Sequence, residues 1–181
     1  PGIALALDPN AVIVASFPTI LVSVVYNIMT GQASSMPLRN NPGAIGSIHA
    51  AGNAAGNVVV AWDEASDGGR RDVWAAQYSG SVNSWFPSVR IESDEVNSMT
   101  GPRVAYAANG QAVVVFTREA GSARDVFVSR YSDSDADGGW SGEALLISFA
   151  TNPDIVATST GGFVVTATDS NSSALFARSC R

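Results

Sequence analysis

The chain has 181 residues, 46% of them hydrophobic, and a mean hydropathy of +0.14, so it can form a packed core and is not expected to be disordered. Sixteen acidic residues outnumber ten basic ones, all Arg, and the net charge of −6 argues against nucleic-acid or anionic-membrane partners, which need a basic face. The single Cys180 excludes an internal disulfide framework and a Cys-based zinc site.

Residues 11–29 are the one stretch apolar and long enough to be mistaken for a membrane span. Pro18 interrupts the stretch near its centre, and β-branched residues are dense on both sides of it. This pattern predicts two strands joined by a turn at 17–19, and no membrane span.

One pattern recurs along the whole chain. Each copy has a first apolar run, a Gly/Asn turn, a second run, a longer polar turn and a third run, and in three copies a fourth short run follows. A Pro opens the first run in three copies, and the third runs end at the equivalent positions Tyr26, Tyr78, Tyr131 and Cys180. The copies occupy residues 1–41, 42–97, 98–149 and 150–181.

Such a repeat predicts an all-β fold, because the runs are short, rich in β-branched residues and separated by turn residues. Four antiparallel strands in about 45 to 55 residues form the unit of a β-propeller blade. We therefore expect a β-propeller of about four four-stranded blades, the last incomplete, forming a single domain or part of one. A β-sandwich is the alternative, although it does not require a fixed distance between the Pro and the second run.

Four motifs recur in the copies: P-x-V/I-A, G-x-x-V-V-V-W/F, D-V-W/F-x-x-x-Y, and a Trp after the third run. In these motifs the chain resembles the sialidase-like, Asp-box-type multi-bladed propellers of secreted bacterial proteins. The resemblance implies an extracellular or cell-surface location. Residues 134–140 only approximate the Asp-box spacing Ser-x-Asp-x-Gly-x-x-Trp, so the resemblance does not specify a substrate.

The polar turns between second and third runs supply the candidate ligand-binding residues. Loops at the rim of a rigid scaffold commonly bind polar ligands. The candidates are Glu64, Arg70, Arg118 and Glu119. The alternative is that charges in these turns, including the repeated Arg71-Asp72 and Arg124-Asp125, only hold the turns by local ion pairs.

Asp133, Asp135 and Asp137 stand at alternate positions before Gly138 and form a candidate Ca²⁺ site. Carboxylates at positions 1, 3 and 5 of a calcium loop converge on one cation. Ala144 stands where an EF-hand needs its Glu, so the alternatives are a hairpin calcium loop, similar to those of other propellers, and a solvated turn.

The sequence shows no catalytic motif, and the only His, His49, is expected to be structural. We therefore expect a non-catalytic extracellular binding or scaffold propeller with a carbohydrate or protein ligand. The alternative is a fragment of a sialidase-like or other polysaccharide-active enzyme. Since no fourth run follows residues 175–180, we also expect another chain or further blades to cover that apolar edge.

Overall fold

The computed structural model describes residues 3–7, 10–17, 20–27, 30–132, 139–172 and 174–180. In these residues the protein is all-β, with four antiparallel sheets, no α-helix and one short 3-10 turn, η1 (Asp67–Gly69). The prediction of an all-β chain is confirmed. The four sheets differ from the alternative β-sandwich, which has two.

Each sheet is formed by strands that follow one another along the chain. The first sheet contains β1 (Ile3–Leu7), β2 (Asn10–Phe17), β3 (Ile20–Asn27) and β4 (Gln32–Asn40). The second contains β5 (Ile45–Gly52), β6 (Val58–Ala65), β7 (Arg71–Ser79), β8 (Ser84–Trp85) and β9 (Val89–Arg90). The third contains β10 (Ser98–Tyr106), β11 (Gln111–Ala120), β12 (Ala123–Ser132) and β13 (Ala144–Ile147). The fourth contains β14 (Ala150–Ala157), β15 (Phe163–Asp169) and β16 (Leu175–Cys180).

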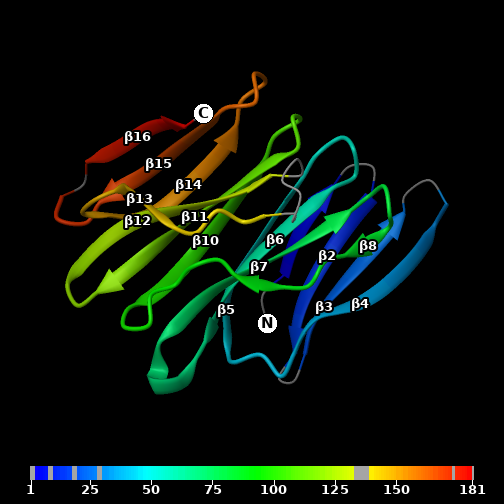
Figure 1. Cartoon of the computed structure of the whole chain (residues 1–181), viewed down its shortest axis with the longest axis horizontal. Coiled ribbons are helices and arrows are strands. Elements are labelled where there is room, and N and C mark those ends of the chain that lie inside the picture. Colours follow the sequence, from blue (N-terminus) through cyan, green and yellow to red (C-terminus); the bar gives the residue numbers. More distant parts are fainter. Residues whose placement is uncertain are drawn as a thin grey trace.

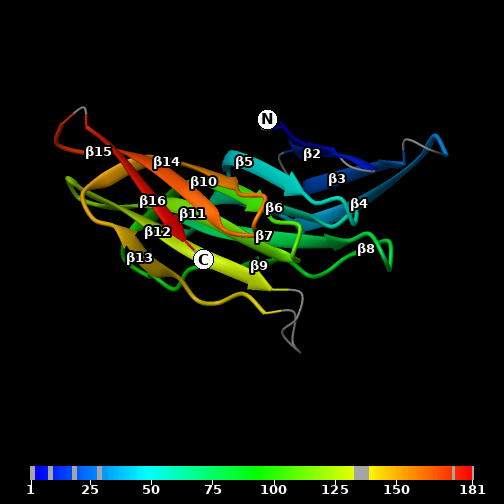
Figure 2. The same cartoon turned by 90° about the horizontal axis from the view of Figure 1, so that it is seen from above.

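The sheets lie side by side in chain order, from the first, in blue, to the fourth, in orange and red (Figure 1). Contacts between first strands join β1 to β5, β5 to β10 and β10 to β14. Viewed from above, β5, β10 and β14 lie along one side of the molecule, and β9 and β13 lie toward the other (Figure 2). The described sheets do not close into a ring.

Three hydrophobic cores fill the spaces between neighbouring sheets. The core between the first and second sheets contains Val14, Leu21 and the fully buried Trp62. The core between the second and third contains Val59 and Phe116, and the core between the third and fourth contains Val115, Val165 and Phe163 among others.

Strand β6 shows why the central strands are apolar without alternation. Val58 and Val60 pack toward the first sheet, whereas Val59 and Ala61 pack toward the third. A strand buried on both faces reads as a continuous apolar run, as the sequence VVVAW does. At the end of the row of sheets, Val156 and Leu175 of the fourth sheet are 58% and 72% exposed.

None of the described residues forms a helix with the length and apolar character needed to span a membrane.

Candidate functional site

A polar cavity of about 270 Å³ lies between the third and fourth sheets, at the start of their first strands. Three strands, β10, β11 and β14, supply its walls, so no single hairpin forms it. The lining residues are Thr100, Gly101, Arg103, Thr117, Glu119, Thr151, Asn152, Pro153 and Asp154.

A β-bulge in each first strand shapes this cavity. The pairing of β10 with β11 shifts between Thr100 and Arg103, and that of β14 with β15 shifts between Thr151 and Asp154. Each bulge contains a residue with positive φ, Gly101 at 62° and Asn152 at 51°. Gly and Asn are the residues that adopt this conformation at the lowest cost. Because a bulge redirects the side chain that follows, the two bulges determine where Arg103 and Asp154 point.

The cavity contains one cation and two carboxylates. The Arg103 side chain donates from Nη1 to the Pro102 carbonyl oxygen at 3.0 Å, and no carboxylate among the described residues forms an ion pair with it. Glu119 accepts a hydrogen bond from Thr100 Oγ1 at 3.2 Å and lies 3.8 Å from Arg124 Nε. Asp154 Oδ1 accepts from the amide of Ile155 at 2.9 Å. A polar ligand in this cavity would meet one cation and two carboxylates.

His49 of β5 lies beside these groups. Its Nδ1 accepts a hydrogen bond from the Val104 amide at 3.1 Å, which joins β5 to β10 and leaves the proton of the neutral ring on Nε2. Burial lowers the pKa of His49, the charge of Arg103 lowers it further, and Asp154 opposes both effects. His49 is therefore neutral at pH 7, in keeping with the structural role expected for it.

Of the four residues that the sequence analysis placed at a rim, only Glu119 lines this cavity. Glu64 is buried and ion-paired with Arg39, while Trp62 Nε1 donates to its Oε2 at 3.0 Å. Arg70 pairs with Asp72 at 2.9 Å and with Glu95 at 3.1 Å.

The fourth rim residue, Arg118, pairs with Asp125 at 2.6 Å and lies over the Phe127 ring, 4.7 Å from its centroid. No hydrogen bond or ion pair within the described part of the chain joins any two of the four candidates. The expected ion pairs at the turns do form, but neither Arg71 nor Arg124 pairs with the Asp that follows it. Arg71 pairs with Asp63, and Arg124 pairs with Glu119.

Arg103 and Asp154 were not singled out from the sequence. Both directly follow the recurring Pro of the first strand, Pro102 and Pro153, and that shared position is the signal that could have identified them. The candidate Ca²⁺ residues Asp133, Asp135 and Asp137 lie outside the described residues.

A second group of charges surrounds Glu92, on the link between β9 and β10. The carboxylate is buried, with Oε2 accepting from the Asp94 amide at 2.8 Å and Oε1 lying 3.4 Å from Arg90 Nε. Burial raises the pKa of Glu92 to about 7. The positive charge of Arg90 lowers this pKa and the negative charge of Asp72 raises it, but burial has the largest effect. This group therefore titrates near neutral pH.

No protein-family model matches the sequence, and no curated protein matches it. Solved structures do share its fold. The Hadza microbial sialidase Hz136 superposes with a TM-score of 0.63 and 10% identity over 100% of this chain and 44% of its own. A thermostable family-43 glycoside hydrolase superposes with a TM-score of 0.55 and 8% identity, over 92% of this chain and 62% of its own. A glucose dehydrogenase superposes with a TM-score of 0.50 and 13% identity, over 90% of this chain and 56% of its own.

At these identities the likeness shows the fold alone, and this chain spans less than two thirds of the length of each of these proteins. Both glycoside hydrolases have propeller-type folds, which agrees with the resemblance to sialidase-like propellers. These glycoside hydrolase neighbours contradict the main expectation from the sequence, a non-catalytic binding or scaffold propeller. They fit its alternative, part of a carbohydrate-active enzyme, better.

Proposed function

We propose that this chain is part of a carbohydrate-active enzyme built on a β-propeller, in which the four sheets are consecutive blades. The contacts among the first strands and the three cores between adjacent sheets support this arrangement. The likeness to a sialidase and a family-43 glycoside hydrolase supports the class of activity. A glycan substrate also fits the extracellular or cell-surface location that the sequence resemblance implies.

The observation that carries the proposal is the convergence of Arg103, Glu119 and Asp154 on one polar cavity. Most glycoside hydrolases use two carboxyl groups, one as the acid and the other as a base or nucleophile. Glu119 and Asp154 are the candidates for this pair. Arg103 donates hydrogen bonds to the hydroxyl or acid groups of the sugar, and Thr100 and Thr117 add hydroxyl groups.

The glucose dehydrogenase has the same fold with a different activity, so the fold by itself does not select hydrolysis. The two carboxylates in one cavity favour hydrolysis over an oxidoreductase function, because paired carboxylates match the requirement of glycoside hydrolysis directly.

The test is hydrolysis of a panel of fluorogenic glycosides, with neutral and acidic sugars, together with binding to a glycan array. Asp154→Asn and Glu119→Gln should each reduce hydrolysis by about a hundredfold or more, because each removes an acid or base. The matched control is Asp67→Asn, an exposed carboxylate in η1 outside the cavity. Absence of both hydrolysis and glycan binding, or full activity in both cavity variants, would refute the proposal.

A further inference from the structure

A histidine ring joins the second and third sheets directly beside the polar cavity. β10 is the edge strand of the third sheet, so its amides that point away from β11 have no partner within that sheet. His49 Nδ1 of β5 accepts a hydrogen bond from one of them, the Val104 amide, at 3.1 Å. Val104 is 2% exposed and belongs to the core between the two sheets, where bulk water does not replace a lost acceptor. His49 therefore helps to determine where β10 lies at Val104.

The position of Arg103 depends on this backbone contact. Arg103 directly precedes Val104, and its guanidinium donates to the carbonyl oxygen of Pro102, its own neighbour in β10, at 3.0 Å. Within the part of the chain that the structure describes, no hydrogen bond joins the Arg103 side chain to another sheet. The side chain therefore follows the backbone of β10.

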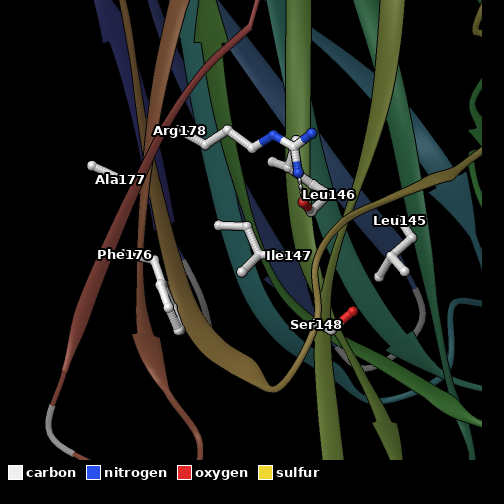
Figure 3. Close-up of a pocket in the computed structure, with 7 residues that line it drawn as sticks. All are labelled: Leu145, Leu146, Ile147, Ser148, Phe176, Ala177 and Arg178. Atoms are coloured by element: carbon white, nitrogen blue, oxygen red, sulfur yellow. Dashed lines mark hydrogen bonds between the residues drawn. The ribbon is translucent and has the colours of Figure 1, made fainter.

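An arginine in a second cavity is held in a different way. This cavity, of about 360 Å³, lies between β13 and β16 (Figure 3). Arg178 of β16 donates from Nη1 across it to the Leu146 carbonyl oxygen of β13, so its guanidinium is bound directly to the neighbouring sheet. The comparison shows that Arg103 lacks such a side-chain contact and depends on the bond between His49 and Val104.

Protonation of His49 removes the acceptor in this bond. The neutral ring accepts at Nδ1 and holds its proton on Nε2, whereas the charged ring donates from both nitrogens. An Nδ1–H would face the Val104 N–H, and two donors cannot form a hydrogen bond. Burial and the positive charge of Arg103 lower the pKa of His49, and Asp154 of β14 raises it. The contact is therefore complete at neutral pH and is lost as the pH falls below the ordinary pKa of His.

The other strands packed against β5 bring no unpaired charge to the ring within the described residues. β1 contains no titratable residue, and the residue of β6 that is paired with His49 is Ala61. Tyr106, the other titratable residue of β10, belongs to the core between the second and third sheets. The carboxylates of β6 are both ion-paired, Asp63 with Arg71 and Glu64 with Arg39.

We propose that His49 is a positioning residue for Arg103: the neutral ring holds β10 against β5 beside the cavity, and the protonated ring releases β10, so that Arg103 moves as the pH falls. Under the proposed function, on which this consequence rests, the cavity then binds its glycan less tightly in acid. The contact between His49 and Val104 does not depend on that function, so the two are tested separately.

Nuclear magnetic resonance of the isotope-labelled whole chain tests the contact without a substrate. The His49 ring and the amides of Arg103 and Val104 are followed as the pH is lowered from about 7.5 to about 4.5. We expect both amides to shift with the midpoint of the ring titration, and the protection factor of the Val104 amide to fall about tenfold or more. The Arg178 Nε signal is the internal control and should not follow this titration.

Two substitutions separate the hydrogen bond from the titration. The Oδ1 of Asn lies the same number of bonds from Cβ as the Nδ1 of His, so His49→Asn keeps an acceptor that does not titrate. This variant should retain the contact and lose the shared pH dependence of the two amides. His49→Ala should lose the contact at every pH, with Arg103 displaced even at neutral pH.

Hydrolysis of the fluorogenic glycoside that the wild type cleaves best gives the functional measurement. His49→Ala should raise KM about tenfold with a smaller change in kcat, because Arg103 binds the substrate and both carboxylates stay in place. The KM of the wild type should rise as the pH falls, and that of His49→Asn should rise less.

A Val104 amide that does not follow the ring titration would overturn this inference. The same pH dependence in His49→Asn, or an unchanged Arg103 amide in His49→Ala, would also overturn it. Absence of hydrolysis by the wild type counts against the proposed function alone, because the resonance experiment still decides whether His49 positions Arg103.

Discussion

The side chain of Arg39 joins the first sheet to the second by donating from Nε to both carboxylate oxygens of Glu64, at 2.8 and 3.0 Å. Its guanidinium also lies over the Trp74 ring, 3.6 Å from the centroid. The Glu64 side chain is only 6% exposed, so this ion pair forms part of the packing between the sheets.

We predict that Glu64→Ala lowers the free energy of unfolding by about 2 to 3 kcal/mol, because it leaves the Arg39 guanidinium and Trp62 Nε1 without their acceptor. Urea denaturation of the variant measures the loss. Glu119→Ala is the control, since that side chain is 38% exposed and its ion pair should contribute less than about 1 kcal/mol. Equal losses in the two variants would contradict the structural role of Glu64.

Glu92 should make the protein less stable as the pH rises. Its pKa is raised to about 7 in the folded state, so the folded protein holds a proton that the unfolded chain has already released above about pH 4.5. The contribution of the protonated Glu92 to the free energy of unfolding is fully present below pH 4.5 and is lost as the pH rises through 7. The total loss is about 3 kcal/mol at most. Glu92→Gln should remove this loss, so that the variant is the more stable protein at pH 8 in urea denaturation.

Glu95 provides a control of opposite sign. A hydrogen bond from Arg90 and another from Arg70 lower its pKa, so its contribution is present above the ordinary pKa of Glu and is lost as the pH falls. Glu95→Gln should flatten the acid side of the stability profile and leave the neutral side unchanged. A Glu92→Gln profile parallel to that of the wild type would show that Glu92 does not titrate near neutrality.

Gly43 lies where the chain passes from the first sheet to the second, against the backbone of Ala65. A Cβ at this position would lie 1.8 Å from the Ala65 carbonyl oxygen, so Gly43→Ala must displace the backbone. We expect a loss of stability of about 1 to 3 kcal/mol. Gly142→Ala, where a Cβ would meet no atom within 4 Å, should change stability by less than about 0.5 kcal/mol in the same thermal or urea unfolding experiment.

Calcium binding by Asp133, Asp135 and Asp137 stays a prediction from the sequence. If these residues bind Ca²⁺ only in the folded state, added calcium should raise the melting temperature by mass action, and Asp135→Ala should remove the response. Identical melting curves in calcium and in chelator would exclude the site.

The sequence alone determined that the chain is all-β and consists of repeated units of short antiparallel strands. The spacing of the apolar runs and turn residues, and the high content of β-branched residues, carry that information. Runs such as that of β6, apolar without alternation, are also typical of strands that are covered on both sides. Neither inference requires knowledge of which residues meet across the interfaces.

Only the tertiary structure decided which of the charged residues share a site. Glu64 and Arg118 each stand two residues after a large buried aromatic, Trp62 or Phe116, so the alternation of a strand places them on the same face as that aromatic. Glu64 is ion-paired there with Arg39 of the preceding sheet, and Arg118 with Asp125 of its own sheet. Glu119 stands one residue further and lines the cavity that Asp154 enters from the fourth sheet. Arg118 and Glu119 are neighbours in β11, yet because side chains alternate along a strand, one forms an ion pair and the other lines the candidate site. The sequence does not show that Asp154 lies across from Glu119, because packing between segments distant in sequence brings the two together.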